Sequence, residues 1–518
     1  MALRAFAIST KTGIGAAALV VGLILAAVCA VLTRAEFGSG LGPADWSAIR
    51  FTVFQAAISA VLSSLLAIPI ARALARRQFP GRGLLVTLLG APFILPVIVA
   101  VLGLLTVFGR AGWLNMALSA LNLPTLSIYG LHGVVLAHVF FNLPLATRLM
   151  LQAWQTIPAE RFRLAAQLDL TPRAVFQSIE WPMLRQIVPG TAALIFVICL
   201  TSFAVALTLG GGPRATTIEL AIYQAFRFDF DLSRAAILSL VQLALAGSAA
   251  LLALWIIPSV SMGGGQDRPR QRWDARGGVQ RIIDILAIGI GALFLLLPLG
   301  AIVTRGLAGI LLTPASVWQA AGTSVGVAMV SIPVLLVLAL PMAGWIATAK
   351  RGSVEAVGLF GVAASPLMIG TGWFILINPF ADPVALALPV TALVNALMAL
   401  PFALRILVPP LRDTVQVYGR LSQALSMTGW PFWRWVALPR LRPQIGFAMG
   451  LTGALSMGDL GVIALFADQD RTTLPLQMYR LMGSYQMEAA AGAALILLAL
   501  SLGIFWIFDK AGRMNAEA

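Results

Sequence analysis

Long apolar runs, each of about 20 residues, recur along the whole chain and leave little room for a soluble domain. Of the 518 residues, 59% are hydrophobic and only 11% are charged. An apolar helix of this length crosses the hydrocarbon core of a bilayer, where every backbone polar group must be satisfied internally. The sequence therefore predicts an all-α, polytopic membrane protein with about 12 transmembrane helices, near 15–33, 53–75, 83–108, 130–151, 188–211, 234–257, 282–304, 319–347, 354–378, 384–408, 444–466 and 488–508.

The basic charges lie mostly in alternate loops. The formal net charge is +15, and most of the 35 Lys and Arg residues lie on the side that holds both termini. Because cytoplasmic loops are enriched in Lys and Arg, both termini are expected in the cytoplasm, in a bacterial inner membrane. The excess of Lys and Arg is then explained by the orientation of the chain in the lipid membrane, and it requires no nucleic-acid partner. Cleavage of the first span as a signal peptide is the alternative, but it would reverse this arrangement.

The residues that several kinds of active site require are absent from this sequence. The three Lys residues, Lys11, Lys350 and Lys510, do not follow Gly, so the phosphate-binding loop of an ATPase is absent. His132 and His138 are the only histidines, and no acidic cluster or Cys accompanies them. We expect no enzyme activity, metal or cofactor in this chain.

One pattern occurs twice, 257 positions apart. Leu143-Pro144-x-Ala146-x-Arg148 recurs as Leu400-Pro401-x-Ala403-x-Arg405, and the segment TTIELAIY at Thr216–Tyr223 corresponds to TTLPLQMY at Thr472–Tyr479. An even number of spans separates the copies, so the two halves have the same orientation and a pathway is expected between them. We expect a first half at 1–260, a cytoplasmic linker at 261–281 and a second half at 282–518.

The duplicated cytoplasmic loops, at 157–187 and 411–443, are too polar to cross a membrane. Each is expected to contain a short amphipathic helix that begins near Thr171 or Thr428 and ends at Pro182 or Pro439. The helix would present an aromatic side chain to a groove on a partner protein: Phe176 in the first loop and Trp433 in the second. An interfacial aromatic belt is the simpler alternative.

These two loops resemble the coupling loops of ABC importer permeases. In that family the sequence Glu-Ala-Ala is followed by a Gly and then, about a dozen residues later, by a Pro in a hydrophobic setting. Asp169 and Ser426 stand where that pattern has Gly, and the Glu is absent, so Gly429 is expected to help the second turn. The resemblance assigns the loops to coupling with an ATPase, through Ala165, Ala166, Asp169, Phe176, Pro182, Leu425, Ser426, Gly429, Trp433 and Pro439.

The match extends to one branch of that family. The segments LAAQLDLTPRAVFQSIEWPMLRQIVP, LGGGPRATTIELAIYQAF and SMGDLGVIALF are similar to the double-length permeases of thiamine and thiamine pyrophosphate importers. The resemblance implies a translocation subunit that works with two copies of an ABC ATPase and a periplasmic solute-binding protein. A permease for ferric iron or another small solute remains an alternative, as do an ion-driven secondary transporter and a membrane scaffold.

Two further groups of residues are candidates for substrate and partner contacts. Asp459 lies inside a predicted span, where a carboxylate is costly, and Ser202 takes the corresponding place in the first half. Asp459 either meets a cationic substrate or caps a broken helix. The resemblance implies that the binding protein docks on the outer segments, at Arg214, Thr216, Thr217, Tyr223, Arg471, Thr472, Thr473 and Tyr479; ordinary loop packing is the alternative.

Overall fold

A computed structural model describes residues 7–514 apart from 37, 39, 91–93, 257–276, 349–364 and 467–471. The described residues form helices and connecting loops without strands, which confirms the predicted all-α class. Within these ranges, eleven helices are long and apolar enough to cross a membrane. The expected span at 354–378 overlaps the gap at 349–364, and the shorter apolar helix Pro366–Ile377 follows that gap.

We refer to residues 7–256 as the first half. Its α-helices are α1 (Ala7–Arg34), α2 (Pro43–Arg76), α3 (Arg82–Leu88), α4 (Val97–Phe108), α5 (Trp113–Ala120), α6 (Leu131–Gln155), α7 (Ala159–Gln167), α8 (Pro172–Val175), α9 (Trp181–Leu200), α10 (Ala204–Leu209), α11 (Ile218–Arg227) and α12 (Leu232–Ile256). A π-helical segment, Phe176–Glu180, joins α8 to α9, and a 3₁₀ turn covers Pro213–Ala215.

Residues 277–514 form the second half. Its α-helices are α13 (Gly278–Gly309), α14 (Ala315–Thr348), α16 (Pro366–Ile377), α17 (Ala387–Ala424), α18 (Trp430–Phe432), α19 (Leu438–Met457), α20 (Gly461–Phe466), α21 (Leu474–Gly483) and α22 (Met487–Arg513). A π-helical segment, Trp433–Ala437, joins α18 to α19, and a 3₁₀ turn covers Ile310–Leu312. Of the expected linker at 261–281, residues 261–276 lie outside the described ranges, and α13 begins at Gly278 rather than at 282.

Three predicted spans are interrupted. The expected helix at 83–108 is wrong as a single element, because α3 ends at Leu88 and α4 begins only after Pro96, which is extended at φ −56° and ψ 132°. The expected helices at 188–211 and 444–466 also break, at 201–203 and at 458–460. Interrupted helices are tolerated at membrane depth where protein surrounds them, and they are common near transport sites.

The first helix of each half packs against the other half. Helix α1 lies along α14 and α16, and α13 lies along α2 and α4. Glycine permits both close approaches. A Cβ atom on Gly372 of α16 would lie 2.4 Å from the carbonyl oxygen of Ala27, and one on Gly103 of α4 would lie 2.7 Å from that of Pro298. The two halves are therefore interlocked by exchanged helices.

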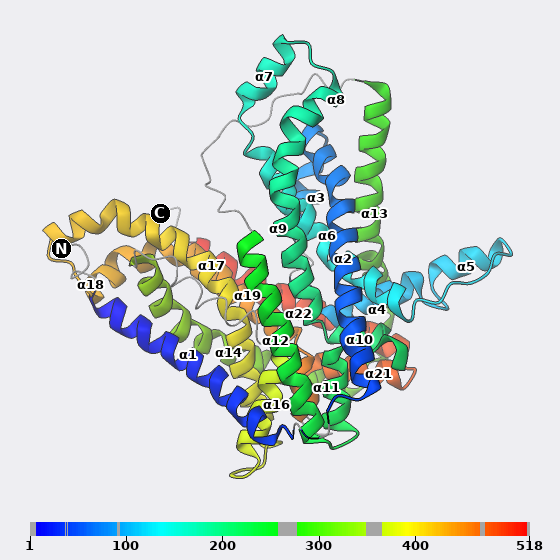
Figure 1. Cartoon of the computed structure of the whole chain (residues 1–518), viewed down its shortest axis with the longest axis vertical. Coiled ribbons are helices and arrows are strands. Elements are labelled where there is room, and N and C mark those ends of the chain that lie inside the picture. The colour runs from blue at the N-terminus through cyan, green and yellow to red at the C-terminus, as the bar shows by residue number, and fades with distance from the viewer. Residues whose placement is uncertain are drawn as a thin grey trace.

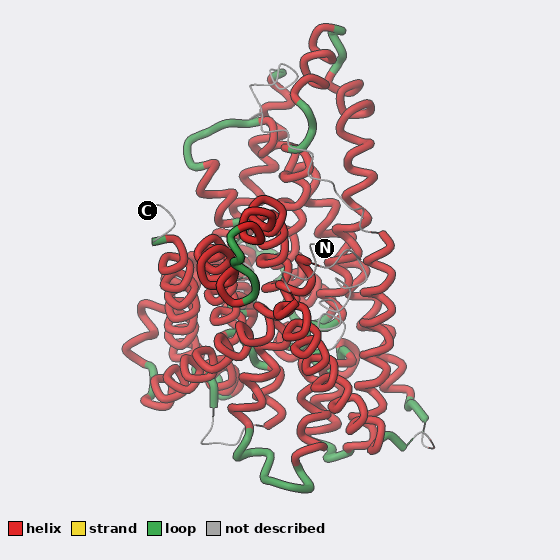
Figure 2. Tube along the Cα trace, turned by 90° about the vertical axis from the view of Figure 1, so that its left-hand side faces the viewer, coloured by secondary structure: helices red, strands yellow, loops and turns green. Residues whose placement is uncertain are grey.

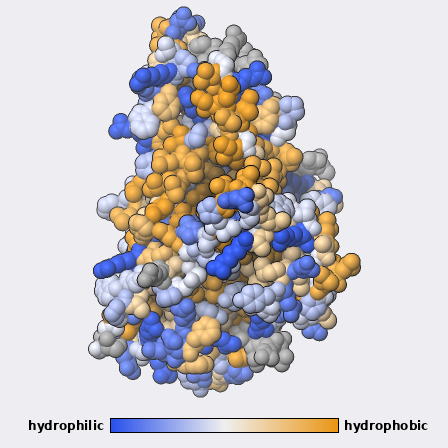
Figure 3. All heavy atoms as spheres, turned by 90° about the vertical axis from the view of Figure 1, so that its right-hand side faces the viewer, coloured by the Kyte–Doolittle hydropathy of each residue, from blue (hydrophilic) through white to orange (hydrophobic). Residues whose placement is uncertain are grey.

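The duplicated loops, which the sequence predicts to be cytoplasmic, lie far from each other. In Figure 1, α7 and α8 form one extremity of the molecule and α18 lies at another, while α11, α16 and α21 gather at the opposite end, which we call the outer end. Figure 2 shows the perpendicular view, in which the described chain consists of helices joined by loops. Figure 3 shows a broad apolar band over the middle and upper part of one face and polar residues toward the outer end. Exposed apolar residues of α13, such as Ile290 and Leu293, suit contact with lipid.

Candidate functional site

The first coupling segment, residues 157–187, turns sharply between α7 and α8. Asp169 adopts a left-handed backbone conformation at φ 50°, and the Thr171 side chain then caps α8 by accepting a hydrogen bond from the Ala174 N–H at 3.3 Å. An Asp residue tolerates this conformation better than most residues do. Asp169 therefore supplies the turn for which the family pattern uses Gly.

The second coupling segment, residues 411–443, makes the corresponding turn. Ser426 is also left-handed, at φ 55°, and Gly429 has φ 68°. Gly429, rather than the expected Thr428, is the residue that precedes α18. Gly429 assists this turn, as expected. Ser426 stands where the family pattern has Gly, and it adopts the same left-handed conformation as Asp169 in the first segment. The two segments share this backbone geometry despite lacking Gly at that position.

The two prolines do not end the short helices as expected. Pro182 and Pro439 lie in the first turns of α9 and α19, where the missing N–H of Pro costs little. Each short helix continues through a π-helical segment, Phe176–Glu180 or Trp433–Ala437, directly into a membrane helix. Such π-segments often occur at functional sites. A displacement of either coupling segment would therefore be transmitted directly to a transmembrane helix.

Phe176 and Trp433 do not project from the surface as expected. Both are half-buried and pack against the hydrophobic core. The guanidinium of Arg72 lies 4.8 Å from the centre of the Phe176 ring, so this ring helps to attach the segment to α2. Four exposed leucines form corresponding pairs instead, Leu164 with Leu421 and Leu168 with Leu425, each 56–63% exposed. Trp430 and Trp435 of the second segment are also exposed.

The remaining coupling candidates divide between surface and interior. Ala165 and Gly429 are buried, whereas Ala166, Asp169, Pro182, Ser426 and Pro439 are exposed. The ATPase-coupling role of all ten residues stays a prediction.

Ion pairs attach the first coupling segment to the end of α2. Arg72 donates a hydrogen bond to Glu180 at 2.6 Å, and the Trp154 indole N–H donates to the other oxygen of Glu180 at 3.3 Å. One turn further along α2, Arg76 and Arg77 contact Asp284 of α13 at 2.7 and 2.8 Å. The end of α2 thus joins the first coupling segment to the first helix of the second half.

Asp459 lies in the break between α19 and α20. Its Oδ1 atom accepts a hydrogen bond from the Gly461 N–H at 3.2 Å, which caps α20. Its Oδ2 atom is buried and has no hydrogen-bond partner among the described residues. Residues of α4, α16, α17 and α19 enclose a cavity of about 190 Å³ beside Asp459, and Asn395 also lines it. Ser202 lies in the corresponding break between α9 and α10.

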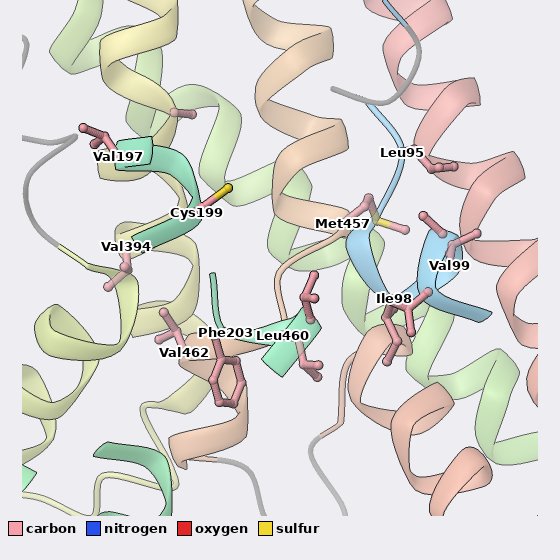
Figure 4. Packing of buried hydrophobic residues seen from close by; sticks show 14 of the residues in the cluster. Leu95, Ile98, Val99, Val197, Cys199, Phe203, Val394, Met457, Leu460 and Val462 are labelled. Atoms are coloured by element: carbon pink, nitrogen blue, oxygen red, sulfur yellow. The ribbon is translucent and has the colours of Figure 1, made fainter. Parts of the chain in front are cut away.

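The two breaks approach each other between the halves. Figure 4 shows Phe203 of the first break near Leu460 of the second break and Val462 at the start of α20. A methyl group placed on Gly461 would lie 3.8 Å from the Phe203 ring. Toward the outer end, Phe374 of α16 contacts Phe226 of α11 and Phe466 of α20, with ring centres 4.6 and 5.5 Å apart. The Phe226–Phe374 contact packs the two halves against each other on the outer side of the breaks.

A buried polar group lies beside each break, and sequence reasoning missed both. In the second half, Ser456 accepts a hydrogen bond from the Asn395 amide at 3.0 Å and lies 3.1 Å from the Ser331 hydroxyl. In the first half the corresponding positions are Ser59, His138 and Cys199, and the Ser59 hydroxyl lies 3.4 Å from His138 Nδ1. The 257-residue offset that pairs the coupling loops also pairs His138 with Asn395 and Cys199 with Ser456. Aligning the two halves at this offset could have pointed to these buried polar positions.

Most of the docking candidates lie below the surface of the outer end. Thr217, Tyr223, Thr472 and Thr473 are at least nine-tenths buried, and Thr217 caps α11 by accepting from the Leu220 N–H at 3.3 Å. Thr216 and Tyr479 are partly exposed. Arg471 lies outside the described residues, and Arg214 lies in the 3₁₀ turn Pro213–Ala215. Their role in docking a binding protein stays a prediction.

Comparison with known proteins gives close relatives over nearly the whole chain. The thiamine transport system permease protein ThiP of Brucella abortus is 41% identical over 489 residues, which is 91% of this chain and 89% of that protein. ThiP of Salmonella typhimurium is 41% identical over 526 residues, 98% of this chain and 97% of the relative. ThiP of Haemophilus influenzae is 35% identical over 472 residues.

A weaker relative matches only part of the chain. The sulfate transport system permease protein CysW of Synechococcus elongatus is 29% identical over 229 residues, 41% of this chain and 78% of that protein. No family model matches the chain.

Full-length similarity above 30%, together with the described all-helical fold, identifies the family. The chain therefore belongs to the thiamine transport system permease proteins, which are permeases of ABC importers.

Proposed function

We propose that this chain forms the translocation pathway of an ATP-driven importer for thiamine or its phosphates in a bacterial inner membrane. Two copies of a separate ATPase subunit bind the coupling segments on the cytoplasmic side, where both termini lie. A periplasmic solute-binding protein delivers substrate to the outer end. The substrate class comes from the ThiP relatives, and the described residues supply the physical support.

The carboxylate of Asp459 carries this proposal. A buried carboxylate oxygen without a hydrogen-bond partner is costly, and a cation that enters the adjacent cavity would relieve this cost. The thiazolium ring of thiamine carries a permanent positive charge. Asn395 and the apolar wall of the cavity suit a small heteroaromatic ring with one polar edge. Asp459 therefore acts as the transient partner of the substrate cation between the two halves.

The duplicated coupling segments support ATP-driven movement. Each offers two exposed Leu side chains on a short cytoplasmic element, and each continues through a π-helical segment into a membrane helix. The segments lie apart in this structure (Figure 1), whereas Phe374 packs against Phe226 of the other half toward the outer end. ATP binding draws the segments together and opens the outer end. This is a shift between two states, driven by contacts that differ between them.

Uptake into proteoliposomes tests the proposal. The complete importer, with its ATPase and binding protein, is given labelled thiamine, thiamine pyrophosphate or ferric iron. We expect ATP-dependent uptake of thiamine compounds only. Asp459→Asn should lower this uptake about tenfold, equivalent to roughly 1.4 kcal/mol, because the amide cannot neutralise the substrate cation.

Ser202→Ala is the matched control, because it changes the corresponding break without removing a charge, and it should retain most of the uptake. Iron uptake, or no uptake of thiamine compounds, would refute the substrate class. Unchanged uptake by Asp459→Asn would refute the role of the carboxylate.

A further inference from the structure

The duplicated Leu-Pro-x-Ala-x-Arg motif places one arginine in each half, Arg148 in α6 and Arg405 in α17. Both side chains are exposed, although both residues lie within candidate membrane spans. Neither guanidinium has an ion-pair or hydrogen-bond partner among the described residues. A charged side chain at membrane depth is costly, and it usually faces the interior of the bundle or a water-filled space. The pair therefore indicates a polar space that both halves border.

Arg405 lies on the face of α17 that lines the cavity beside Asp459. Asn395, Met398 and Phe402 line this cavity, at spacings of three and four residues. Arg405 follows Phe402 by three residues, so the helical repeat places it on the same face. At a rise of 1.5 Å per residue it lies about 4.5 Å further along the helix axis, toward the second coupling segment. Arg405 thus follows directly after the wall of the cavity.

Arg148 approaches the same region from the first half. A methyl group placed on Gly90 would lie 2.7 Å from Nη1 of Arg148, so the guanidinium lies against this glycine. Gly90 is four residues before Ile94, where residues 94–97 begin to line the cavity beside Asp459. Seven residues after Arg148, α6 ends at Gln155, close to the start of the first coupling segment. Each half therefore contributes one arginine on the side of the cavity that leads to the coupling segments.

Two guanidinium groups without carboxylate partners suit an anionic ligand. Guanidinium groups bind phosphate through paired, charge-assisted hydrogen bonds. The cavity beside Asp459 has a volume of about 190 Å³, whereas sites for small organic molecules usually enclose about 300–1,000 Å³. A solute whose ring enters this cavity therefore extends beyond it. Asp459 and the two arginines then offer charges of opposite sign to the two ends of one solute.

We propose that Arg148 and Arg405 bind the phosphate groups of a phosphorylated solute while its cationic ring faces Asp459. This inference rests on the proposed function, because it takes thiamine compounds as the substrates. The ring lies in the cavity, and the phosphates lie next to it on the side of the coupling segments. The pathway therefore binds thiamine pyrophosphate more tightly than thiamine, which lacks the phosphates.

Titration calorimetry tests the inference on the chain with its ATPase in lipid nanodiscs, without nucleotide or binding protein. Thiamine pyrophosphate should bind with a Kd about tenfold below that of thiamine. Arg148→Gln and Arg405→Gln should each raise the Kd of the pyrophosphate about tenfold and leave that of thiamine unchanged, because only the phosphates contact the guanidinium groups. Arg405→Lys should retain part of the affinity, because the charge remains and the paired hydrogen bonds are lost.

Arg50→Gln is the matched control, because it removes the same charge from an exposed position of α2 near the outer end. Thr52, two residues later, accepts a hydrogen bond from the Ile218 N–H of α11 there. The control should bind both compounds as the wild type does. Equal Kd values for the two compounds in the wild type would overturn the inference, as would wild-type binding of the pyrophosphate by both Gln variants.

Lipid headgroups also carry phosphate, so the titrations are repeated in a maltoside detergent, which carries none. The same preference for the pyrophosphate is expected in both media. A preference that appears in detergent and is lost in nanodiscs would show that lipid occupies the arginines, and would overturn the inference.

Binding by the permease with its ATPase and uptake by the complete importer are separate readouts. Uptake of thiamine compounds with binding that does not depend on the arginines overturns this site alone. Failed uptake with binding that does depend on them overturns the proposed function.

Discussion

At the scale of single residues, the two carboxylate oxygens of Asp459 have different surroundings. Oδ1 caps α20 through the Gly461 N–H, and Oδ2 is buried without a partner among the described residues. The two interpretations that the sequence leaves open for Asp459 are therefore compatible: one oxygen stabilises the broken helix, and the other is available to a ligand. Ser202, at the corresponding break, brings no charge, so the two breaks differ in charge.

Glu219 is a buried carboxylate in α11, outside the candidate membrane spans. Burial raises its pKa from 4.5 to about 8. The unfolded chain loses this proton above pH 4.5 while the folded chain retains it, so the stability of the folded state falls as the pH rises from 4.5 to 8. Glu219→Gln should remove this dependence, so that the variant has a higher Tm than the wild type at pH 8 and a similar Tm at pH 4.5.

Thermal unfolding in detergent at the two pH values measures this difference. Glu160→Gln is the control, because Glu160 forms only an exposed pair with Arg163 at 3.8 Å and should leave the pH dependence unchanged. A Glu219→Gln variant whose Tm tracks that of the wild type at both pH values would contradict the expected burial effect.

At the scale of helices, the coupling segments expose other apolar side chains than the sequence predicted, so different residues have to be substituted to test coupling. The exposed Leu168 and Leu425, rather than the half-buried Phe176 and Trp433, are available to a partner. Leu168→Ser combined with Leu425→Ser should lower ATP-driven uptake at least about tenfold, because burying a Leu side chain in a partner's groove contributes about 1.5–3 kcal/mol. The fold should persist, because both side chains are exposed.

Uptake and ATPase activity of the reconstituted importer measure the uncoupling. Leu311→Ser is the control, because Leu311 is 90% exposed in the 3₁₀ turn after α13, outside both coupling segments. Wild-type uptake by the double variant would show that these leucines do not contact the ATPase.

The sequence predicted the helices well and their interruptions poorly. Hydrophobic length locates α2, α6 and α14, because crossing a bilayer requires a minimum apolar run. The 257-residue repeat also located both coupling segments. The π-helical continuation past Pro182 was not predictable, because Pro ends a helix or begins one according to the hydrogen bonds available around it. Burial of Phe176 depends on Arg72, which is more than 100 residues away and leaves no local signal.

At the scale of the whole molecule, two interlocked halves meet at the outer end and separate toward the coupling segments. The exchanged helices α1 and α13 hold the halves together, and Asp284 of α13 joins Arg76 and Arg77 of α2. Because removal of one partner of a buried ion pair commonly costs about 3–5 kcal/mol, this contact restricts how the halves can separate. The proposed movement is a tilt of the two halves that brings the coupling segments together.

The distance between the coupling segments tests this account most directly. Spin labels are placed at Gln167 and Ala424, two exposed and corresponding positions, after replacement of Cys29 and Cys199. The distance between the labels is then measured by double electron–electron resonance in nanodiscs. With the ATPase bound, ATP should shorten the distance between the labels, and hydrolysis should restore it. A distance that stays unchanged when ATP binds and drives uptake would contradict the tilting of two halves through these segments.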